Sequence, residues 1–240
     1  MPGPLLALDT STSIGSVAVG ADGALLAEAV FNAGAGHSAA LLPAMDWTLR
    51  SAGIERSELA GVVVGSGPGS FTGLRIAVAT AKGLMFALGV PLHAYSGLLA
   101  VAAGVTADRP VCALFDARRR DVYAAAYRIG TGADGVEQVF APEALALDKL
   151  LDRFRGGPPP LFAGEGATLH RAEIERELGA RVAPPHLAFP RASALLWLAG
   201  AVPERGWVED PVAWEPEYVR PSGAERIAAA RAGGGTGVGG

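Results

Sequence analysis

The chain has 240 residues, a formal net charge of −4 and one cysteine, and 50% of its residues are hydrophobic. At about 100 to 200 residues per domain, this length allows one large or two small domains with a sizeable core, and a single cysteine excludes an internal disulfide. The only dense basic cluster is Arg118-Arg119-Arg120, which argues against a protein that binds nucleic acid by itself.

The first hundred residues predict the order βββαβα. Short strand-like runs joined by brief links indicate an antiparallel meander, and a further buried strand follows later. Apolar residues at helical spacing predict the helices. The predicted strands cover 5–10, 14–20, 24–31 and 60–64. The predicted helices cover 38–52, 72–88 and 96–103.

The second half of the chain predicts the same order of elements. Its strands cover 110–117, 121–129, 136–141 and 161–163. Its helices cover 143–154, 168–178 and 191–200. In each half an aspartate, Asp9 or Asp116, closes the first strand and a glycine turn follows the fourth. This agreement indicates an internal duplication of a βββαβα unit.

The duplication predicts an α/β protein of two lobes. We expect an N-terminal lobe over 1–106 and a C-terminal lobe over 107–222, whose last helix and extended segment can return to the first lobe. The glycine-rich end of the chain cannot bury enough apolar surface to become ordered, so 223–240 is predicted to be a flexible tail. Two lobes of this kind match the plan of the actin-like ATPases (the ASKHA, RNase H-like fold).

A glycine-rich turn, Gly65 to Arg75, joins a buried strand to the helix over 72–88. It is not a Walker A loop, because no lysine follows the glycines. The turn points backbone amides at the start of a helix, where anions bind well. Alternatively, the glycines only allow the strand-to-helix corner to pack tightly. The residues leave both interpretations open.

The first hairpin and the arginine cluster could complete an anion site. In actin-like phosphotransferases the first hairpin cradles phosphate, and its aspartate holds magnesium through water. Here the same aspartate could merely cap the hairpin, and the arginines could either bind phosphate or pair with Asp116 and Asp121. The candidate nucleotide or anion site consists of Asp9, Thr10, Ser11, Gly67, Gly69, Ser70 and Arg118.

Neither the histidines nor the cysteine indicates catalysis. Leu41 stands one helical turn after His37, where a His-x-x-x-His metal motif would need its second imidazole, so His37 is predicted to be a capping or interface residue. Cys112 lies in an apolar run and is predicted to be a core residue. We predict no catalytic residue and no metal site. The chain has no apolar run of about 18 residues and no signal peptide, and we expect a soluble, cytosolic protein.

Several motifs together resemble the bacterial TsaB (YeaZ) family, and the resemblance spans residues 5 to about 221. The most specific is the glycine-rich stretch 67–76, and the segment 216–220 resembles that family's C-terminal Pro-x-Tyr-hydrophobic-Arg. The other stretches that carry the resemblance are 6–11, 37–43, 79–84 and 116–119.

The resemblance implies an actin-like fold and a role in making N6-threonylcarbamoyladenosine in tRNAs that read codons beginning with A. It implies a non-catalytic partner of the paralogue TsaD, which carries the metal, and of the ATPase TsaE. It also implies homodimers of the isolated chain, tRNA contact only through the complex, no membrane, and no cofactor except a possible ATP or ADP at the partner interface. The expected interface residues are His37, Leu41, Leu42, Met45, Leu49, Ile76, Ala79 and Phe86.

Three other functions are compatible with this fold. A stand-alone small-molecule kinase or ATPase would bind ATP and magnesium by itself. A metallopeptidase would need a histidine pair, which is missing at Leu41. An RNase H-like nuclease needs clustered carboxylates for two metal ions, whereas the first half offers Asp9 and Glu28 with no obvious third.

Overall fold

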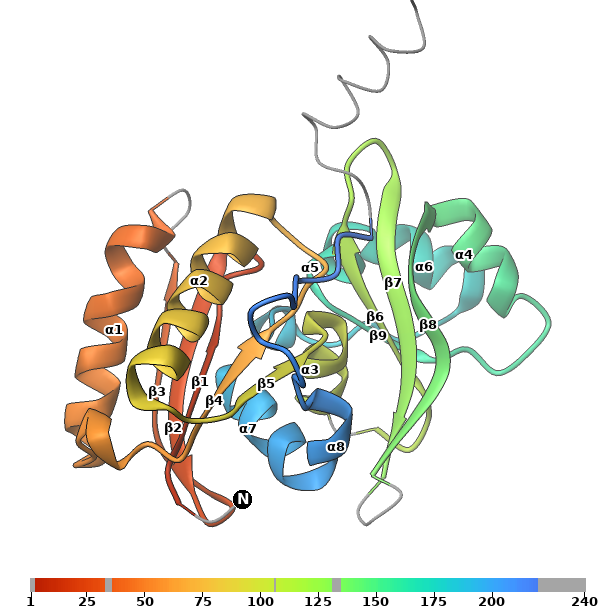
Figure 1. Cartoon of the computed structure of the whole chain (residues 1–240). Coiled ribbons are helices and arrows are strands. Elements are labelled where there is room, and N and C mark those ends of the chain that lie inside the picture. The colour runs from red at the N-terminus through yellow and green to blue at the C-terminus, as the bar shows by residue number, and fades with distance from the viewer. Residues whose placement is uncertain (1–2, 33–35, 106, 131–134, 220–240) are drawn as a thin grey trace, which may run out of the picture.

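Two mixed β-sheets, one from each half of the chain, form the frame of the molecule (Figure 1). This computed structural model describes residues 3–32, 36–105, 107–130 and 135–219. The first sheet has the order β3-β2-β1-β4-β5, with β1, β2 and β3 antiparallel and β1, β4 and β5 parallel. Its strands are β1 (Leu5–Asp9), β2 (Ile14–Ala21), β3 (Ala24–Asn32), β4 (Gly61–Gly65) and β5 (Leu92–Tyr95).

The second sheet repeats this topology with four strands, in the order β8-β7-β6-β9. As in the first sheet, the first three strands are antiparallel and the fourth is parallel to the first. The strands are β6 (Val111–Asp116), β7 (Asp121–Ile129), β8 (Val136–Ala146) and β9 (Leu161–Ala163). The predicted duplication is therefore confirmed in its order of elements.

Helices cover both faces of each sheet, which gives five layers. Helices α1 and α2 pack on the outer face of the first sheet, α3 and α7 lie between the sheets, and α4, α5 and α6 cover the outer face of the second. The longer helices are α1 (His37–Ala52), α2 (Phe71–Leu88), α3 (Gly97–Ala103), α4 (Leu147–Phe154), α6 (Arg171–Leu178) and α7 (Ala192–Ala201). The short ones are α5 (Glu165–Leu169) and α8 (Pro203–Gly206), with 3₁₀ turns at Arg56–Glu58 and Pro185–Leu187.

Three hydrophobic clusters match these layers. The middle cluster joins the two lobes, because side chains of both sheets, such as Ala7 and Phe115, belong to it together with Leu195 and Leu198 of α7. Cys112 is fully buried in the cluster under the second sheet, as predicted, and burial raises the pKa of its thiol far above the ordinary range. A thiol in this setting is inert at neutral pH.

The predicted elements differ from the structure in four places. The predicted helix over 143–154 is wrong at its start, because Glu143–Ala146 continue β8 and pair with β7. The predicted helix over 168–178 consists of α5 and α6, which meet at His170. Sequence analysis predicts neither β5 nor α8. Both are short, and β5 depends on its parallel pairing with β4, a long-range contact that no local pattern reveals.

A carboxylate network fixes α7 to the first sheet. Glu28 of β3 accepts hydrogen bonds from the Arg191 guanidinium, from the backbone and hydroxyl of Ser193, and from Ser16. Burial alone would raise the pKa of Glu28, but the hydrogen bonds from Arg191 and Ser193 outweigh it and lower the pKa. Glu28, which the nuclease alternative would require as a metal ligand, is thus fully engaged with α7.

The structure describes only part of the predicted domain limits. Helix α7 packs on β1 and β2 of the first lobe, as the sequence analysis allowed. Residue 106 and the predicted tail 223–240 lie outside the described residues. The limits of the two lobes therefore stay a prediction.

Candidate functional site

A cleft of about 630 Å³ opens where the two lobes meet. Four segments supply most of its walls: the β1–β2 hairpin and the glycine turn of the first lobe, the β6–β7 loop of the second, and the strap. The strap is the segment 207–219, which follows α8. The cleft is lined by Ser11, Thr12, Ser13, His37, Pro68, Gly69, Ser70, Phe71, Thr72, Leu74, Phe115, Asp116, Ala117, Arg118, Tyr123, Glu165, Glu217, Tyr218 and Val219.

The glycine turn packs directly on the first hairpin. A Cβ atom added to Gly69 would lie 2.3 Å from the Ser11 carbonyl oxygen, and one added to Gly73 would lie 1.9 Å from that of Thr10. The Ser70 amide donates to the Ser11 carbonyl at 2.7 Å, and the Thr10 hydroxyl donates to the Gly73 carbonyl at 2.7 Å. The glycines therefore allow two backbone segments to touch, which decides between the two interpretations of this turn in favour of close packing.

The same packing uses up the polar groups of the hairpin. Both the amide and the hydroxyl of Ser11 donate to Asp9 Oδ1 at 2.8 Å. The Thr12 hydroxyl donates to the Ile14 carbonyl at 2.9 Å. Asp9 and Thr10 are fully buried and lie outside the cleft lining. These groups do not fit a magnesium triphosphate, because their donors already have protein partners and their carboxylate cannot reach a metal in the cleft.

Of the seven residues predicted for an anion site, the structure brings four to the cleft. Those four are Ser11, Gly69, Ser70 and Arg118, whereas Asp9, Thr10 and Gly67 lie behind the cleft wall. Gly67 contacts the strap instead, near the Glu217 carbonyl. A nucleotide held at an interface with a partner stays a prediction.

Asp9 is a buried carboxyl group with an unusual pKa. Burial raises the pKa to about 6, and the hydrogen bonds from Ser11 oppose this shift. Its Oδ2 has no hydrogen-bond partner among the described residues and lies against Gly65, where no side chain separates the two strands. Ionisation of this group in the folded state is therefore unfavourable.

Replacing Asp9 with asparagine should remove one pH dependence of stability. The folded pKa is raised, so the stabilising contribution of the protonated group is complete below about pH 4 and is lost as the pH rises through about 6. The free energy of unfolding of the unsubstituted chain should therefore fall by about 2 to 3 kcal/mol relative to Asp9→Asn over this range. Urea denaturation of both proteins between pH 4 and 8 measures this difference, and a difference that does not vary with pH would contradict it.

The second lobe and the strap contribute mostly acidic groups to the cleft. Asp116 and Glu165 of the second lobe and Glu217 of the strap line it together with Arg118. The pKa of Glu165 is raised by burial and by the charge of Asp116. The Asp116 carboxylate accepts a hydrogen bond from the Arg118 amide at 2.8 Å, which fixes the start of the β6–β7 loop.

His37 connects α1 to the hairpin. It is 5% exposed, and its Nε2–H donates to the Thr12 carbonyl at 2.8 Å. The prediction that His37 lies on a partner surface needs correction, since its ring is almost fully buried against the first hairpin, at the wall of the cleft. In the described part of the chain, no three histidine, cysteine or acidic side chains come together as potential metal ligands.

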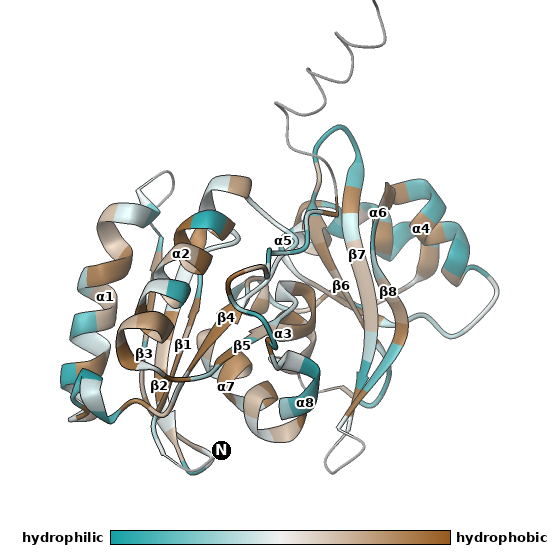
Figure 2. Ribbon diagram, viewed as in Figure 1, coloured by the Kyte–Doolittle hydropathy of each residue, from teal (hydrophilic) through white to brown (hydrophobic). Residues whose placement is uncertain are grey.

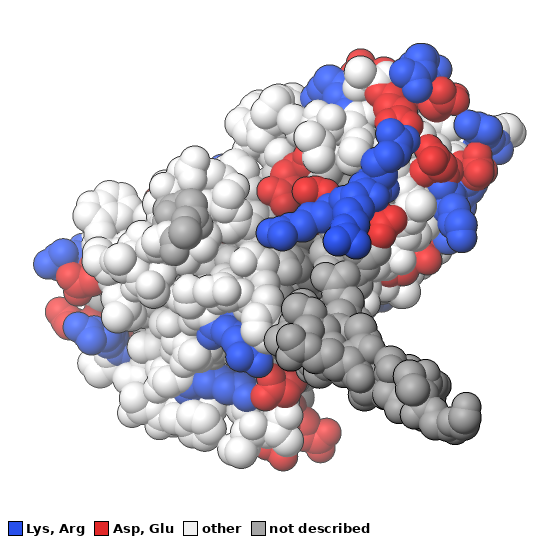
Figure 3. Space-filling model, turned by 90° about the horizontal axis from the view of Figure 1, so that it is seen from above, with Lys and Arg blue, Asp and Glu red and all other residues white. Residues whose placement is uncertain are grey.

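The outer face of α1 and α2 is exposed and strongly apolar. Leu42 is 59% exposed, Trp47 52% and Phe86 58%. Ile76 is partly exposed and Ala79 exposed on the same side of the fold. Figure 2 shows fewer hydrophilic positions on α1 and α2 than on α4 and α6, and Figure 3 shows charged side chains gathered over the second lobe. We call the exposed side of α1 and α2 the apolar helix face.

Besides His37, three of the predicted interface residues do not lie on this face. Leu41, Met45 and Leu49 are buried against the first sheet, with at most 5% of their surface exposed. The prediction placed the apolar stripe of α1 outward, but a stripe at helical spacing on a helix that covers a sheet must face the sheet. Trp47, which the sequence analysis missed, is exposed on α1 instead. It does not belong to the predicted apolar stripe, and only the burial of that stripe reveals it.

The family model described as TsaD, tRNA N6-adenosine threonylcarbamoyltransferase, matches residues 31–225. The tRNA threonylcarbamoyladenosine biosynthesis protein TsaB of Bacillus subtilis is 34% identical over 227 residues, which cover 92% of this chain and 96% of the relative.

Solved structures agree with these matches. YeaZ from Pseudomonas aeruginosa has a TM-score of 0.75 and 30% identity, and covers 90% of this chain and 99% of its own. The ethanolamine utilization protein EutJ from Carboxydothermus hydrogenoformans, at 13% identity and a TM-score of 0.52 over 82% of this chain and 90% of its own, shares the fold alone. The predicted actin-like ATPase fold is confirmed.

Proposed function

Because the chain belongs to the TsaB (YeaZ) family of tRNA threonylcarbamoyladenosine biosynthesis proteins, we propose that it is a non-catalytic subunit that activates the threonylcarbamoyltransferase TsaD. It acts in the cytoplasm through a direct contact between the two proteins. The ATPase TsaE joins this complex, and without TsaD the chain forms a homodimer through the same surface.

The observation that carries this proposal is the apolar helix face. Helix α2 is 18 residues long with a mean hydropathy of 1.3, apolar enough by length and composition to cross a membrane, yet only 33% of it is buried in the chain. Its inner side packs on β1 and β4, which identifies it as part of the lobe. Large contiguous apolar surfaces on folded domains usually mark protein contacts. The outer side of α2, with α1 beside it, therefore favours a protein partner.

The cleft supports a non-catalytic role. The hairpin that would hold phosphate in an actin-like enzyme packs on the glycine turn, and the hydroxyls of Thr10, Ser11 and Thr12 donate to protein oxygens. Leu41, in place of a second metal-binding histidine, is buried in the core. These residues favour an N-terminal lobe that serves the assembly of the complex with TsaD.

Reconstitution tests this proposal. Purified chain, TsaD, TsaE, threonylcarbamoyl-adenylate and unmodified tRNA are combined, and modified adenosine is quantified by mass spectrometry with and without the chain. We expect modification to require the chain, and we expect the chain to co-elute with TsaD in size-exclusion chromatography. Equal modification without the chain would refute the role. Sub-millimolar binding of ATP and magnesium by the chain alone would favour a stand-alone kinase.

A further inference from the structure

The β6–β7 loop holds three consecutive arginines in an uncommon backbone conformation. Arg118, Arg119 and Arg120 have φ angles of 65°, 56° and 64°. Residues with a side chain seldom adopt this left-handed region, and three in succession are rarer still. Asparagine or glycine would adopt it more easily, yet the chain carries three long cationic side chains here.

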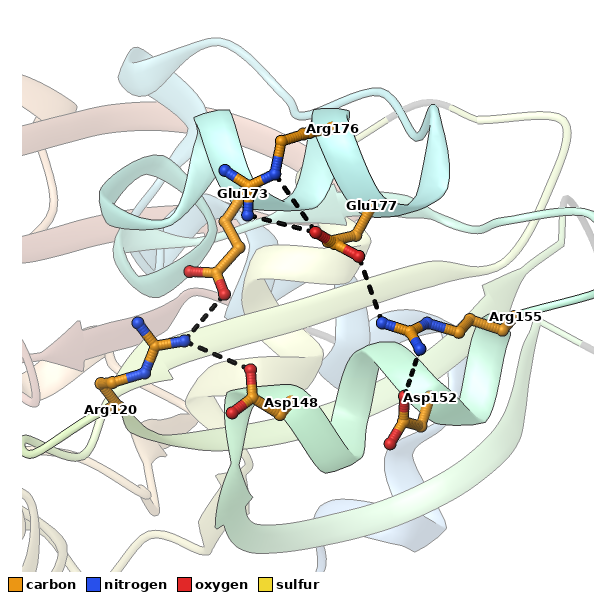
Figure 4. Close-up of polar contacts among 7 residues, drawn as sticks. All are labelled: Arg120, Asp148, Asp152, Arg155, Glu173, Arg176 and Glu177. Carbon is orange, nitrogen blue, oxygen red and sulfur yellow. Dashed lines mark hydrogen bonds and ion pairs between the residues drawn. The ribbon is translucent and has the colours of Figure 1, made fainter.

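The loop is fixed at both ends, and Arg120 is part of its support. The Asp121 amide donates to the Arg118 carbonyl at 3.0 Å, and the Leu147 amide donates to the Arg120 carbonyl at 3.0 Å. The Arg120 guanidinium bridges Asp148 of α4 and Glu173 of α6, at 3.2 and 2.8 Å. Figure 4 shows this bridge beside a second group of ion pairs around Arg155 and Glu177.

The other two guanidinium groups have no partner in the part of the chain that the structure describes. Among the described residues, neither the Arg118 nor the Arg119 guanidinium has a hydrogen bond or an ion pair, and both side chains are exposed. Arg118 lines the cleft, and in Figure 3 basic side chains reach from the second lobe toward its boundary with the first. Two exposed cations thus lie side by side in the sequence on a hydrogen-bonded loop, and the first of them lines the cleft.

We propose that Arg118 and Arg119 bind phosphodiester groups of the tRNA backbone when the complex acts on tRNA. This inference rests on the proposed function and adds a direct contact of this chain with the substrate. Arginine suits this task, because its planar guanidinium donates two parallel hydrogen bonds to one phosphate.

The charges around the loop favour a polynucleotide backbone over a small nucleotide. A nucleoside di- or triphosphate inside the cleft would lie beside the carboxylates of Asp116, Glu165 and Glu217, which line its wall. The negative phosphates and these negative carboxylates would repel each other, which opposes binding. A tRNA backbone that passes outside the cleft can contact the arginines with phosphates that each carry a single charge. It does not need to enter the cleft, where the carboxylates lie.

The test measures tRNA binding by the complex with TsaD as a function of salt. Arg118→Gln combined with Arg119→Gln should weaken binding about tenfold at low salt and reduce the slope of log K against log salt by about 1.5. Lysine at both positions should restore the slope, because the charges return. The matched control is Arg109→Gln combined with Arg128→Gln, at the opposite ends of β6 and β7, and it should change neither quantity.

The possible results distinguish failure of this inference from failure of the proposed function. An unchanged affinity and slope in a complex that still assembles would overturn this inference and leave the proposed function intact. Failure of the unsubstituted chain to co-elute with TsaD would overturn the proposed function and the inference with it. Calorimetric titration of the isolated chain with ADP should give no binding heat. Binding of ADP that the double glutamine variant abolishes would assign the arginines to a nucleotide instead.

Discussion

Replacing Leu42 and Phe86 with arginine should separate the chain from TsaD while the fold remains intact. Both side chains are more than half exposed on the apolar helix face, so neither substitution disturbs the core. In the complex, two unpaired charges would be buried in an apolar contact, and the association constant should fall by at least about 100-fold. Size-exclusion chromatography and the modification assay measure the loss, and circular dichroism monitors the fold.

A matched control distinguishes this surface from apolar surface in general. Leu169 of α5 is 63% exposed on the second lobe, so Leu169→Arg adds the same charge far from the apolar helix face. It should leave assembly and modification unchanged. If the double variant co-elutes with TsaD as the unsubstituted chain does, the assignment of this face is wrong. Met45→Glu is unsuitable for this test, because Met45 is buried and its replacement would unfold the lobe.

Replacing Gly73 with alanine should destabilise the protein strongly, although alanine normally favours a helix. The added methyl group would lie 1.9 Å from the Thr10 carbonyl oxygen, a backbone atom that cannot move without shifting β1 or α2. We expect the free energy of unfolding to fall by about 3 kcal/mol, as for a severe overpacking of a core. Chemical denaturation monitored by tryptophan fluorescence measures this change.

The same helix offers a control of opposite sign. A Cβ atom at Gly83 would meet nothing within 4 Å, so Gly83→Ala should raise the free energy of unfolding by about 0.5 to 1 kcal/mol. Equal effects of the two substitutions would show that helix propensity, and not contact with the hairpin, governs Gly73. Because Gly83 is exposed on α2, its alanine variant also reports whether a partner approaches the helix closely there.

The order of elements could be predicted because it depends on local patterns. Short strand-like runs and the helical spacing of apolar residues in α1 and α2 are properties of short segments. The elements that were missed depend on distant partners. Strand β5 exists through its pairing with β4, and Glu143–Ala146 are extended because β7 lies beside them.

The site was harder to predict for the same reason. The sequence identified the hairpin, the glycine turn and Arg118, but it could not show that the first two pack on each other and satisfy each other's polar groups. The direction of the apolar stripe on α1 was likewise undetermined by spacing alone. Leu41 and Leu42 are adjacent leucines, and only the position of the first sheet makes one core and the other surface.

The contact of α7 with the first sheet also bears on how the chain folds during synthesis. Domains usually fold from the N-terminus as the polypeptide leaves the ribosome. Here Leu195 and Leu198 cover the inner face of a sheet whose last strand ends at Tyr95, about a hundred residues earlier. The N-terminal lobe therefore remains incomplete, with an apolar sheet face uncovered, until nearly the whole chain has been translated.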